Sequence, residues 1–311
     1  MRHTGAPQAQ LIATERVAVN GHMNPLRRRL VASSAALLAQ RAFAQTTAKA
    51  PPVAWPRTAS VPGGVAHVPL GASPAPPQAW LGDQRVLVRR EGAGWVALVG
   101  IALAETAGNL LALTVQQPGG ARETRTIKVG AKSYAEQRLK VPRDKVDLSK
   151  EDLARHERER AHLARVLATF TESTPSSLAM LPPAPGRRSS SFGLRRYFNG
   201  QPRAPHNGMD IAAPLGTPVV AASAGRVLDA GDYFFPGRMV ILDHGLGVLS
   251  LYAHLSEIDV AAQQSVAAGA PIGKLGATGR VTGPHLHFSV YLNATAVDPA
   301  LFLQPEVAEP K

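Results

Sequence analysis

The sequence predicts a mainly β protein in which two β-rich regions are joined by one helix. Across 311 residues, 28 glycines and 26 prolines interrupt short runs of Val, Leu and Ile, a pattern typical of strands separated by turns. One long segment, beginning near Ser149, has a helical pattern instead. The length and the 45% hydrophobic content suffice for two modest cores. We therefore predict a small Ig-like β-sandwich, a connecting α-helix and a C-terminal antiparallel β-sheet domain.

The N-terminal segment has the pattern of an export signal. Arg27-Arg28-Arg29 precedes the apolar stretch Leu30 to Ala39, and Ala42 and Ala44 are small residues where a signal peptidase cleaves. The apolar stretch is too short to cross a hydrocarbon layer about 30 Å thick, so we predict no permanent transmembrane helix. Residues 1–44 are predicted to be a signal peptide, with Met23 as an alternative start and an amphipathic helix as the alternative structure. The predicted location is the periplasm or cell envelope, by the Sec or the twin-arginine route.

The cysteine content limits the possible metal ligands, and the net charge limits the possible binding partners. The chain has no cysteine, so a metal must be bound by histidines and carboxylates. Its formal net charge is +12, of which residues 1–44 carry +5, so the remainder keeps +7 and favours an anionic partner. The predicted export and the 5% aromatic content argue against nucleic acid. A polymer of the cell envelope fits better.

The first β-rich region follows a Pro/Ala-rich linker at residues 45–57 and spans residues 58–147. Its apolar segments are separated by Gly, Pro and Asn residues, and the last of them partly alternates as a half-exposed strand does. We predict that they form the sandwich, and that the isolated His67 is structural. The predicted strands are 64–70, 85–88, 95–101, 110–115 and 122–129.

A helix is predicted over residues 148–171. Ser149, with Asp152 three residues later, resembles a capping box, and acidic residues suit the positive end of a helix. His156 and His162 fall on different faces, and both are predicted to be solvated. Residues 172–191, rich in Pro, Ser and Arg, are predicted to be a linker or a loop that crosses the next domain. The expected apolar stripe contains Leu153, His156, Arg160, Leu163 and Leu167.

The second β-rich region, residues 192–305 before a short tail at 306–311, contains three histidine clusters. His206 and Asp210 enclose Asn-Gly, which opposes a helix, so a turn must bring them together. His285 and His287 project to one face of a predicted strand. His254 follows the strand that includes residues 247–251 and would be structural if it stood alone. The predicted strands are 218–221, 225–230, 238–243, 247–253, 272–275 and 286–291.

Together these clusters supply what a zinc hydrolase needs. Such an enzyme uses about three nitrogen or oxygen ligands and keeps one open position for a water molecule. Four histidines and one aspartate give three ligands and leave two imidazoles for the water and the developing oxyanion. The spacing does not decide which side chains are the ligands.

The three clusters resemble the signature of the M23 metallopeptidases, the LytM/lysostaphin-like endopeptidases of peptidoglycan. The resemblance rests on His206-x3-Asp210, Tyr252-Ala-His254-Leu and His285-Leu-His287. It implies that His206, Asp210 and His287 bind one zinc ion, whereas His254 and His285 assist catalysis. It also implies that His244 is structural, and the family often has Gly where Gln263 stands. Further matching segments are 192–195, 208–219, 224–227, 243–245, 272–273 and 278–288.

The resemblance implies a secreted zinc-dependent endopeptidase that hydrolyses peptide crosslinks of peptidoglycan. Its substrates would be stem peptides, and a regulatory envelope protein is a further expected partner. Gly-rich loops at 231–237 and 278–283 are expected to wall a narrow groove. One alternative is a noncatalytic LytM-type regulator that activates other cell-wall hydrolases, although such regulators typically lose ligands. Another is a zinc amidase or carboxypeptidase of a different family.

The sequence leaves several properties open. They include the crosslink that is cut, the start codon, the export route and the oligomeric state. The front half is predicted either to restrain activity by folding over the groove or to act as a spacer.

Overall fold

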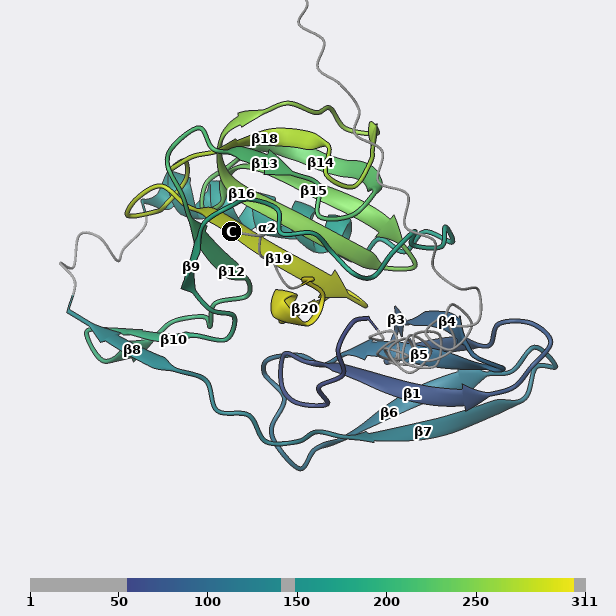
Figure 1. Ribbon diagram of the computed structural model, residues 1–311. Coiled ribbons are helices and arrows are strands. Elements are labelled where there is room, and N and C mark those ends of the chain that lie inside the picture. The colour runs from purple at the N-terminus through teal and green to yellow at the C-terminus, as the bar shows by residue number, and fades with distance from the viewer. Residues whose placement is uncertain (1–54, 141–148, 305–311) are drawn as a thin grey trace, which may run out of the picture. The chain divides into compact units, whose positions relative to one another are not determined.

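The computed structural model describes residues 55–140 and 149–304, and Val53–Lys311 form one compact unit (Figure 1). The described residues are mainly β with one α-helix, which confirms the predicted fold class. The predictions of a signal peptide, of the first linker up to residue 54 and of a C-terminal tail concern residues outside the described ranges. Among the described residues, no helix has the length and apolar character needed to span a membrane.

The first region is built from two antiparallel sheets around a core of their own. Its outer strands keep exposed side chains on one face, whereas residues 96–100 are buried on both faces. Leu70 and Val99 from one sheet meet Leu113 and Ile127 from the other. One sheet has the order β1 (Val65–Gly71), β5 (Gly94–Gly100), β4 (Leu87–Glu91). The other has the order β3 (Gln84–Arg85), β2 (Gln78–Leu81), β6 (Leu110–Gln116), β7 (Arg122–Lys128).

The helix α2 (Lys150–Leu167) begins as the sequence predicts. Ser149 Oγ accepts a hydrogen bond from the backbone N–H of Asp152 at 3.0 Å. Of the predicted apolar stripe, Leu163 and Leu167 pack on a sheet face together with their neighbour Val166. Leu153, at the other end of the stripe, is 46% exposed. The two histidines predicted to be solvated both make contacts: His162, whose side chain is 44% exposed, places Nε2 2.6 Å from Asp229 Oδ2, and the ring of His156 lies edge-on to that of Phe235 with centroids 4.6 Å apart.

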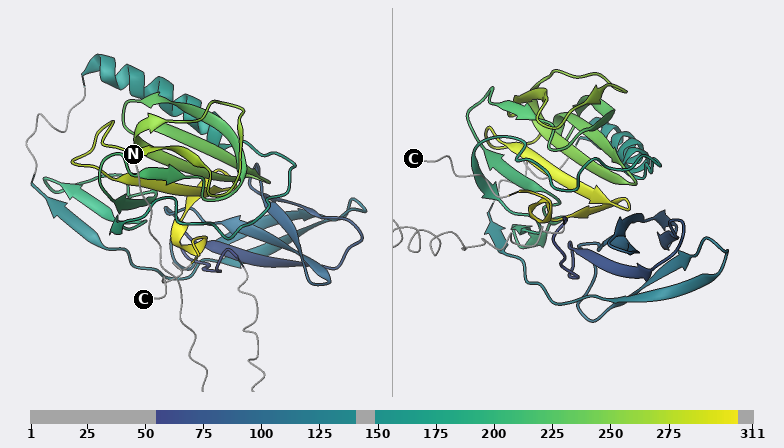
Figure 2. Two further views of the ribbon diagram at one scale, coloured as in Figure 1. Left: turned by 45° about the horizontal axis from the view of Figure 1, so that its top comes forward. Right: turned by 45° about the vertical axis from the view of Figure 1, so that its right-hand side comes forward.

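The second region is a large antiparallel sheet, and α2 lies along one of its faces (Figure 2). The other face covers the largest core, which includes Tyr252, Leu286 and Phe288. The main strand order is β17 (Ser265–Val266), β14 (Gly225–Tyr233), β15 (Gly237–Gly245), β16 (Val248–Ile258), β19 (Leu286–Leu292), β12 (Met209–Ala212), β9 (Arg187–Ser190). The strands β13 (Pro218–Val220), β18 (Pro271–Leu275) and β20 (Thr295–Val297) join this sheet at its sides.

The segment predicted as a linker at residues 172–191 is partly ordered sheet and core. Leu178 and Met180 are buried in the large core, so this part crosses the domain as one of the two predictions had it. The end of the segment is different, because residues 187–190 form β9 and pair with β12. A small separate sheet stands beside β9 and consists of β8 (Glu136–Leu139), β10 (Arg195–Phe198) and β11 (Gln201–Pro202), with β8 and β10 parallel. We call this sheet the arm.

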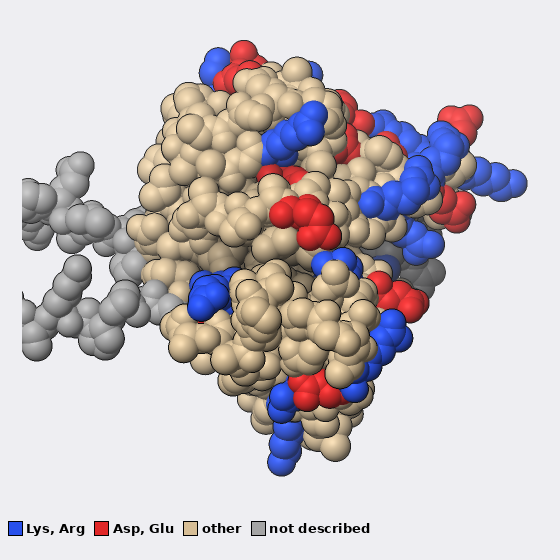
Figure 3. Space-filling view, turned by 90° about the vertical axis from the view of Figure 1, so that its right-hand side faces the viewer, with Lys and Arg blue, Asp and Glu red and all other residues tan. Residues whose placement is uncertain are grey.

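The surface charge is mixed on the face that Figure 3 shows, where Lys and Arg side chains are interspersed with Asp and Glu. The net positive charge of the sequence is therefore not gathered into a single large basic area on that face. The arm carries a more local concentration of arginines, at positions 138, 195 and 196, and Arg203 follows directly after β11.

Candidate metal centre

The centre lies where β12 and β19 pair. Asp210 stands directly opposite His287 in the antiparallel register, and His206 reaches both through the turn that precedes β12. Gly208 makes this turn fit: a Cβ there would lie 2.5 Å from Ser289 Oγ and 2.6 Å from His287 Cε1. The close approach of the turn to β19 therefore requires glycine.

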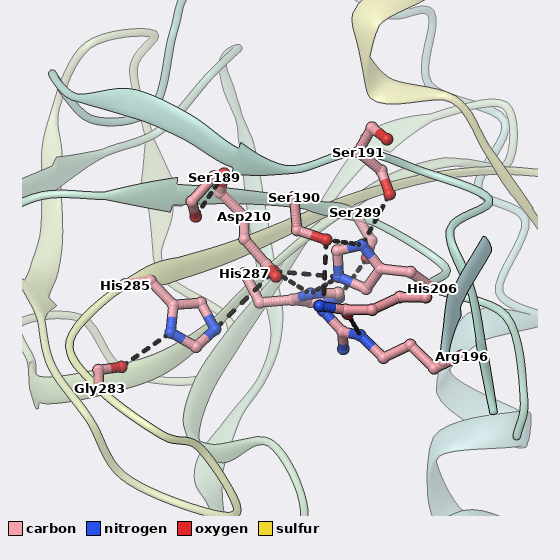
Figure 4. A network of polar contacts seen from close by, with 11 residues as sticks. Ser189, Ser190, Ser191, Arg196, His206, Asp210, Gly283, His285, His287 and Ser289 are labelled. Atoms are coloured by element: carbon pink, nitrogen blue, oxygen red, sulfur yellow. Dashed lines mark hydrogen bonds and ion pairs between the residues drawn. The ribbon is translucent and has the colours of Figure 1, made fainter. Parts of the chain in front are cut away.

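Three side-chain atoms converge on one point (Figure 4). His206 Nε2, Asp210 Oδ1 and His287 Nδ1 lie 3.0 Å from one another in all three pairs. Ligands at about 2.0 Å from a tetrahedral zinc ion are about 3.3 Å apart, so little movement separates this triangle from a coordination site. The three side chains are only 9%, 11% and 14% exposed. They form a group that could bind a metal.

Outer hydrogen bonds orient the two imidazoles of this triangle. His206 Nδ1–H donates to the carbonyl oxygen of Ser191 at 3.0 Å, which leaves the Nε2 lone pair facing the centre. His287 Nε2–H donates to Ser289 Oγ at 2.9 Å, which leaves Nδ1 facing it. Metal-ligating histidines use their second nitrogen in this way. The two rings are therefore held in the tautomers that a metal ion needs.

His254 reaches the same groove because β16 is bulged. The prediction ended the strand before His254, but the strand continues to Ile258. Ala253 and His254 face the single residue Met239 on β15, and His254 adopts a φ of 65°. Its backbone N–H donates to the carbonyl oxygen of Pro236 at 2.9 Å, which holds this conformation. A bulge with a left-handed residue redirects a side chain from the strand's ordinary alternation.

His254 and His285 form a second pair of imidazoles beside the triangle. His254 Nδ1–H donates to the carbonyl oxygen of Thr278 at 3.0 Å, and His285 Nδ1–H donates to that of Gly283 at 2.9 Å. Their ring centroids are 4.8 Å apart. His285 Nε2 is 3.8 Å from Asp210 Oδ1, farther than the atoms of the triangle. In each ring the hydrogen bond to the carbonyl oxygen uses Nδ1, so Nε2 remains available for proton transfer.

The pKa shifts of His254, His287 and Asp210 agree with two neutral imidazoles near one carboxylate. Burial lowers the pKa of His254 to about 4, and the neighbouring rings of His287 and His285 lower it further against the bond to Thr278. Burial also lowers the pKa of His287. For Asp210, burial alone would raise the pKa, but the imidazoles of His206 and His287, each 3.0 Å from its Oδ1, outweigh burial and hold the pKa well below its usual range. These are the protonation states in which the groups bind metals.

The centre opens into a groove of about 1420 Å³. Both loops that the sequence predicts as walls contribute, through Phe235 and Pro236 and through residues 279–284. Gly237 and Gly279 allow the two loops to touch, because a Cβ on either would lie within 2.4 Å of the other loop's backbone. The helix α2 lines the groove as well, with His156, Glu159, Arg160, Leu163, Ala164 and Leu167.

His244 has a structural role outside the centre, as the resemblance implies. His244 is buried, donates from Nδ1 to the carbonyl oxygen of Ala224 and contacts Ser250 Oγ through Nε2, each at 2.7 Å. It lies outside the group of converging side chains.

Gln263 adopts a φ of 72°, the left-handed conformation that glycine favours. The turn around Gln263 therefore keeps a glycine-like conformation.

Sequence reasoning missed the side chains and carbonyls that orient the histidines. Ser289 could have been found, because it lies two residues after His287 and therefore on the same strand face. Ser191 could not, since its role depends on β9 pairing with β12 across a segment that was predicted to be a linker. Arg196, which lines the groove from the arm, carried no signal in the sequence.

Comparisons with known proteins decide the family. The model of peptidase family M23 matches residues 204–299, and that of the M23 N-terminal domain matches residues 58–132. The crystal structure of a Pseudomonas aeruginosa protein assigned to peptidase M23 is 41% identical, covers 79% of this chain and 96% of its own, and has a TM-score of 0.68. The chain belongs to peptidase family M23. Peptidases of this family are metal-dependent, and in this M23 chain the His206, Asp210 and His287 group could hold the metal.

Curated relatives of this M23 chain match it over a shorter length. Peptidoglycan DD-endopeptidase ShyA of Vibrio cholerae is 42% identical over 113 residues, which is 36% of this chain and 26% of ShyA. DD-carboxypeptidase/endopeptidase Mpg of Neisseria meningitidis is 42% identical over 119 residues, which is 38% of this chain and 27% of Mpg. The matched segment thus spans about a quarter of the length of either relative.

Proposed function

We propose that this M23 chain is a secreted zinc-dependent endopeptidase that hydrolyses peptide crosslinks of peptidoglycan. The observation that carries the proposal is the triangle of His206 Nε2, Asp210 Oδ1 and His287 Nδ1, with the imidazoles of His254 and His285 beside it. Relatives named as peptidoglycan endopeptidases support the substrate class. A noncatalytic regulator is less well supported, since the chain keeps all five side chains.

The donor set suits zinc better than calcium or magnesium. Two imidazole nitrogens and one carboxylate oxygen are typical of a catalytic zinc site with an open fourth position, whereas calcium and magnesium prefer oxygen ligands alone. When bound, zinc would polarise the scissile carbonyl and lower the pKa of a water molecule. His206 is held for this by Ser191, and His287 by Ser289.

The remaining two histidines would move protons. His254, whose pKa is lowered to about 4, is neutral at physiological pH and can accept a proton at Nε2. His285 lies beside it with Nδ1 bonded to a carbonyl, so its Nε2 can also face the reacting atoms. One of them would take up the proton of the attacking water at Nε2, and the ring protonated in this way could then donate a hydrogen bond to the tetrahedral oxyanion or pass the proton to the leaving amine.

Digestion of defined crosslinked muropeptides tests the proposal. We expect mass spectrometry to show crosslinked dimers converted to monomers, the conversion to stop with a chelator and to return with added zinc. Release of free stems would indicate an amidase instead, and release of terminal D-Ala alone would indicate a carboxypeptidase, an activity that the name of the relative Mpg includes. A metal-loaded protein that cleaves nothing would favour the regulator.

We also propose that α2 restrains access to the groove. Its residues line the groove that contains the metal centre. The helix is held there by polar contacts to β14 and the turn that follows it: His162 binds Asp229 in the middle of β14, and Glu159 Oε2 accepts the backbone N–H of Phe234 at 2.8 Å. A peptide that follows the sheet face beyond the centre would have to displace the helix.

Weakening these contacts should raise activity. We expect the double variant His162→Ala, Glu159→Ala to digest sacculi about fivefold faster or more, because losing each hydrogen bond costs the closed arrangement about 1 kcal/mol. Glu157→Ala, an exposed change on the same helix, serves as the control. Equal rates for the double variant and the unchanged protein would show that the helix is a spacer.

A further inference from the structure

The Arg196 side chain stands in the wall of the groove beside the metal centre. It extends from β10, which pairs with β8 so that Arg196 lies opposite Gln137. Nε donates to Gln137 Oε1 at 3.3 Å, and Nη2 donates to Ser190 Oγ at 3.4 Å. Ser190 Oγ in turn lies 3.3 Å from His206 Nδ1 (Figure 4). A single hydroxyl therefore separates this guanidinium from a proposed metal ligand.

The charge of Arg196 is not compensated by these contacts. A guanidinium has five N–H donors, and both of its partners here are neutral and distant. Among the residues that the structure describes, no carboxylate forms an ion pair with it, whereas Arg138 on the neighbouring strand pairs with Glu136 at 3.1 Å. Arg196 is half-buried, so water compensates the charge only in part.

The acidic residues of the groove are already engaged elsewhere. Of the described residues that line it, only Glu159 and Asp210 carry a carboxylate. Asp210 belongs to the triangle, and Glu159 accepts hydrogen bonds from Arg155 at 2.6 Å and from Phe234 N–H. An anionic group that enters the groove thus meets a cation with free donors. Arginine binds carboxylates through two parallel hydrogen bonds, which fixes orientation as well as distance.

We propose that Arg196 binds a free carboxylate within the stem peptide of the substrate, on the D-glutamyl residue or the diamino acid, and so places the scissile bond over the metal centre. The inference rests on the proposed function, because crosslinked stem peptides carry carboxylates at these two residues. Arg196 is then a specificity residue of the groove and takes no part in holding the metal.

Matched substrates with and without the carboxylate test this inference. Three crosslinked dimers are compared: one with all carboxylates free, one with the diamino-acid carboxyl as a carboxamide, and one with the D-glutamyl carboxyl as a carboxamide. For the unchanged protein we expect one of the two amidated dimers to be cleaved about 10- to 100-fold less efficiently, mainly through KM. The dimer that loses efficiency identifies the carboxylate that is bound.

The substitution Arg196→Gln should abolish this preference. The variant should cleave all three dimers at the lower efficiency. Glutamine keeps a donor for Ser190 but loses the charge, and Arg196→Lys should restore part of the preference because it restores the charge without the fork. The matched control is Arg138→Gln, which removes an arginine from the same arm that already pairs with Glu136 and does not line the groove. It should leave the preference unchanged.

The outcomes separate the inference from the function on which it rests. If Arg196→Gln slows all dimers equally and keeps the preference, Arg196 only supports Ser190 and His206, and the inference is wrong. It is also wrong if the unchanged protein cleaves all three dimers equally, although the proposed function then stands. If the zinc-loaded protein cleaves none of them, the proposed function fails, and the inference fails with it.

Discussion

Replacing His287 by alanine is expected to remove both metal binding and peptidase activity. His287 supplies the atom opposite Asp210 in the triangle, and without it only two of the three converging atoms remain. Because a catalytic metal contributes several kcal/mol to transition-state stabilisation, we expect activity to fall about 10³-fold or more. Metal content by elemental analysis and activity on crosslinked muropeptides are measured on the same samples.

The variant His285→Ala tests whether His285 is a catalytic residue rather than a metal ligand like His287. His285 Nε2 lies 3.8 Å from Asp210 Oδ1 and its ring is held by Gly283, outside the triangle. We expect this variant to keep the metal while losing about 10²- to 10⁴-fold in activity, the usual contribution of a positioned acid or base. His67→Ala, in the sandwich, is the control and should change neither quantity. If His285→Ala loses the metal and His287→Ala retains it, the two assignments are reversed.

Gly208→Ala is expected to affect both folding and metal binding. The added methyl group would stand 2.5 Å from Ser289 Oγ and 2.6 Å from both His287 Cε1 and the carbonyl oxygen of Phe288. Either the turn or β19 must shift, and overpacking of this kind costs about 1–3 kcal/mol of folding stability. The shift would also move His206 away from His287, so we expect metal affinity to fall at least tenfold. Denaturant unfolding and metal titration measure the two effects.

Gly283→Ala is the matched control for this change. Gly283 also lies in the groove, but a Cβ there would meet no atom within 4 Å. Its carbonyl oxygen, which holds His285, is retained in the variant. We expect stability and metal affinity close to those of the unchanged protein. A Gly208→Ala protein that matches this control in both measurements would show that the turn can relax without consequence.

The sequence predicts the fold class and most strands because their signals are local. The run Trp95 to Ile101, for example, lies in β5 with a shift of one residue at either end. Strand β9 could not be predicted in this way, since Arg187 to Ser190 is polar and is held by β12, which follows some twenty residues later. For α2 the cap at Ser149 is local and predictable, whereas the contact of His162 with Asp229 depends on tertiary packing.

At the centre, strand periodicity placed His285 and His287 in the same groove, and the structure brings both there. Periodicity could not select the member that completes the triangle, because that depends on the register that sets Asp210 opposite His287. It also could not predict that His254 enters the groove, because a bulge and a left-handed backbone interrupt the alternation at that residue.

The pairing of Asp210 with His287 also links the metal to the folding of the sheet. The flanking pairs, Met209 with Phe288 and Ile211 with Leu286, are apolar and buried. A slip of β12 by one residue would turn Asp210 into the core and these apolar side chains out of it. An ion that binds only the correct pairing stabilises it by mass action and ties together residues 77 positions apart. A metal ion would therefore bind only a chain in which β12 and β19 are paired in the correct register. A chain with β12 misaligned would bind no metal and would be inactive.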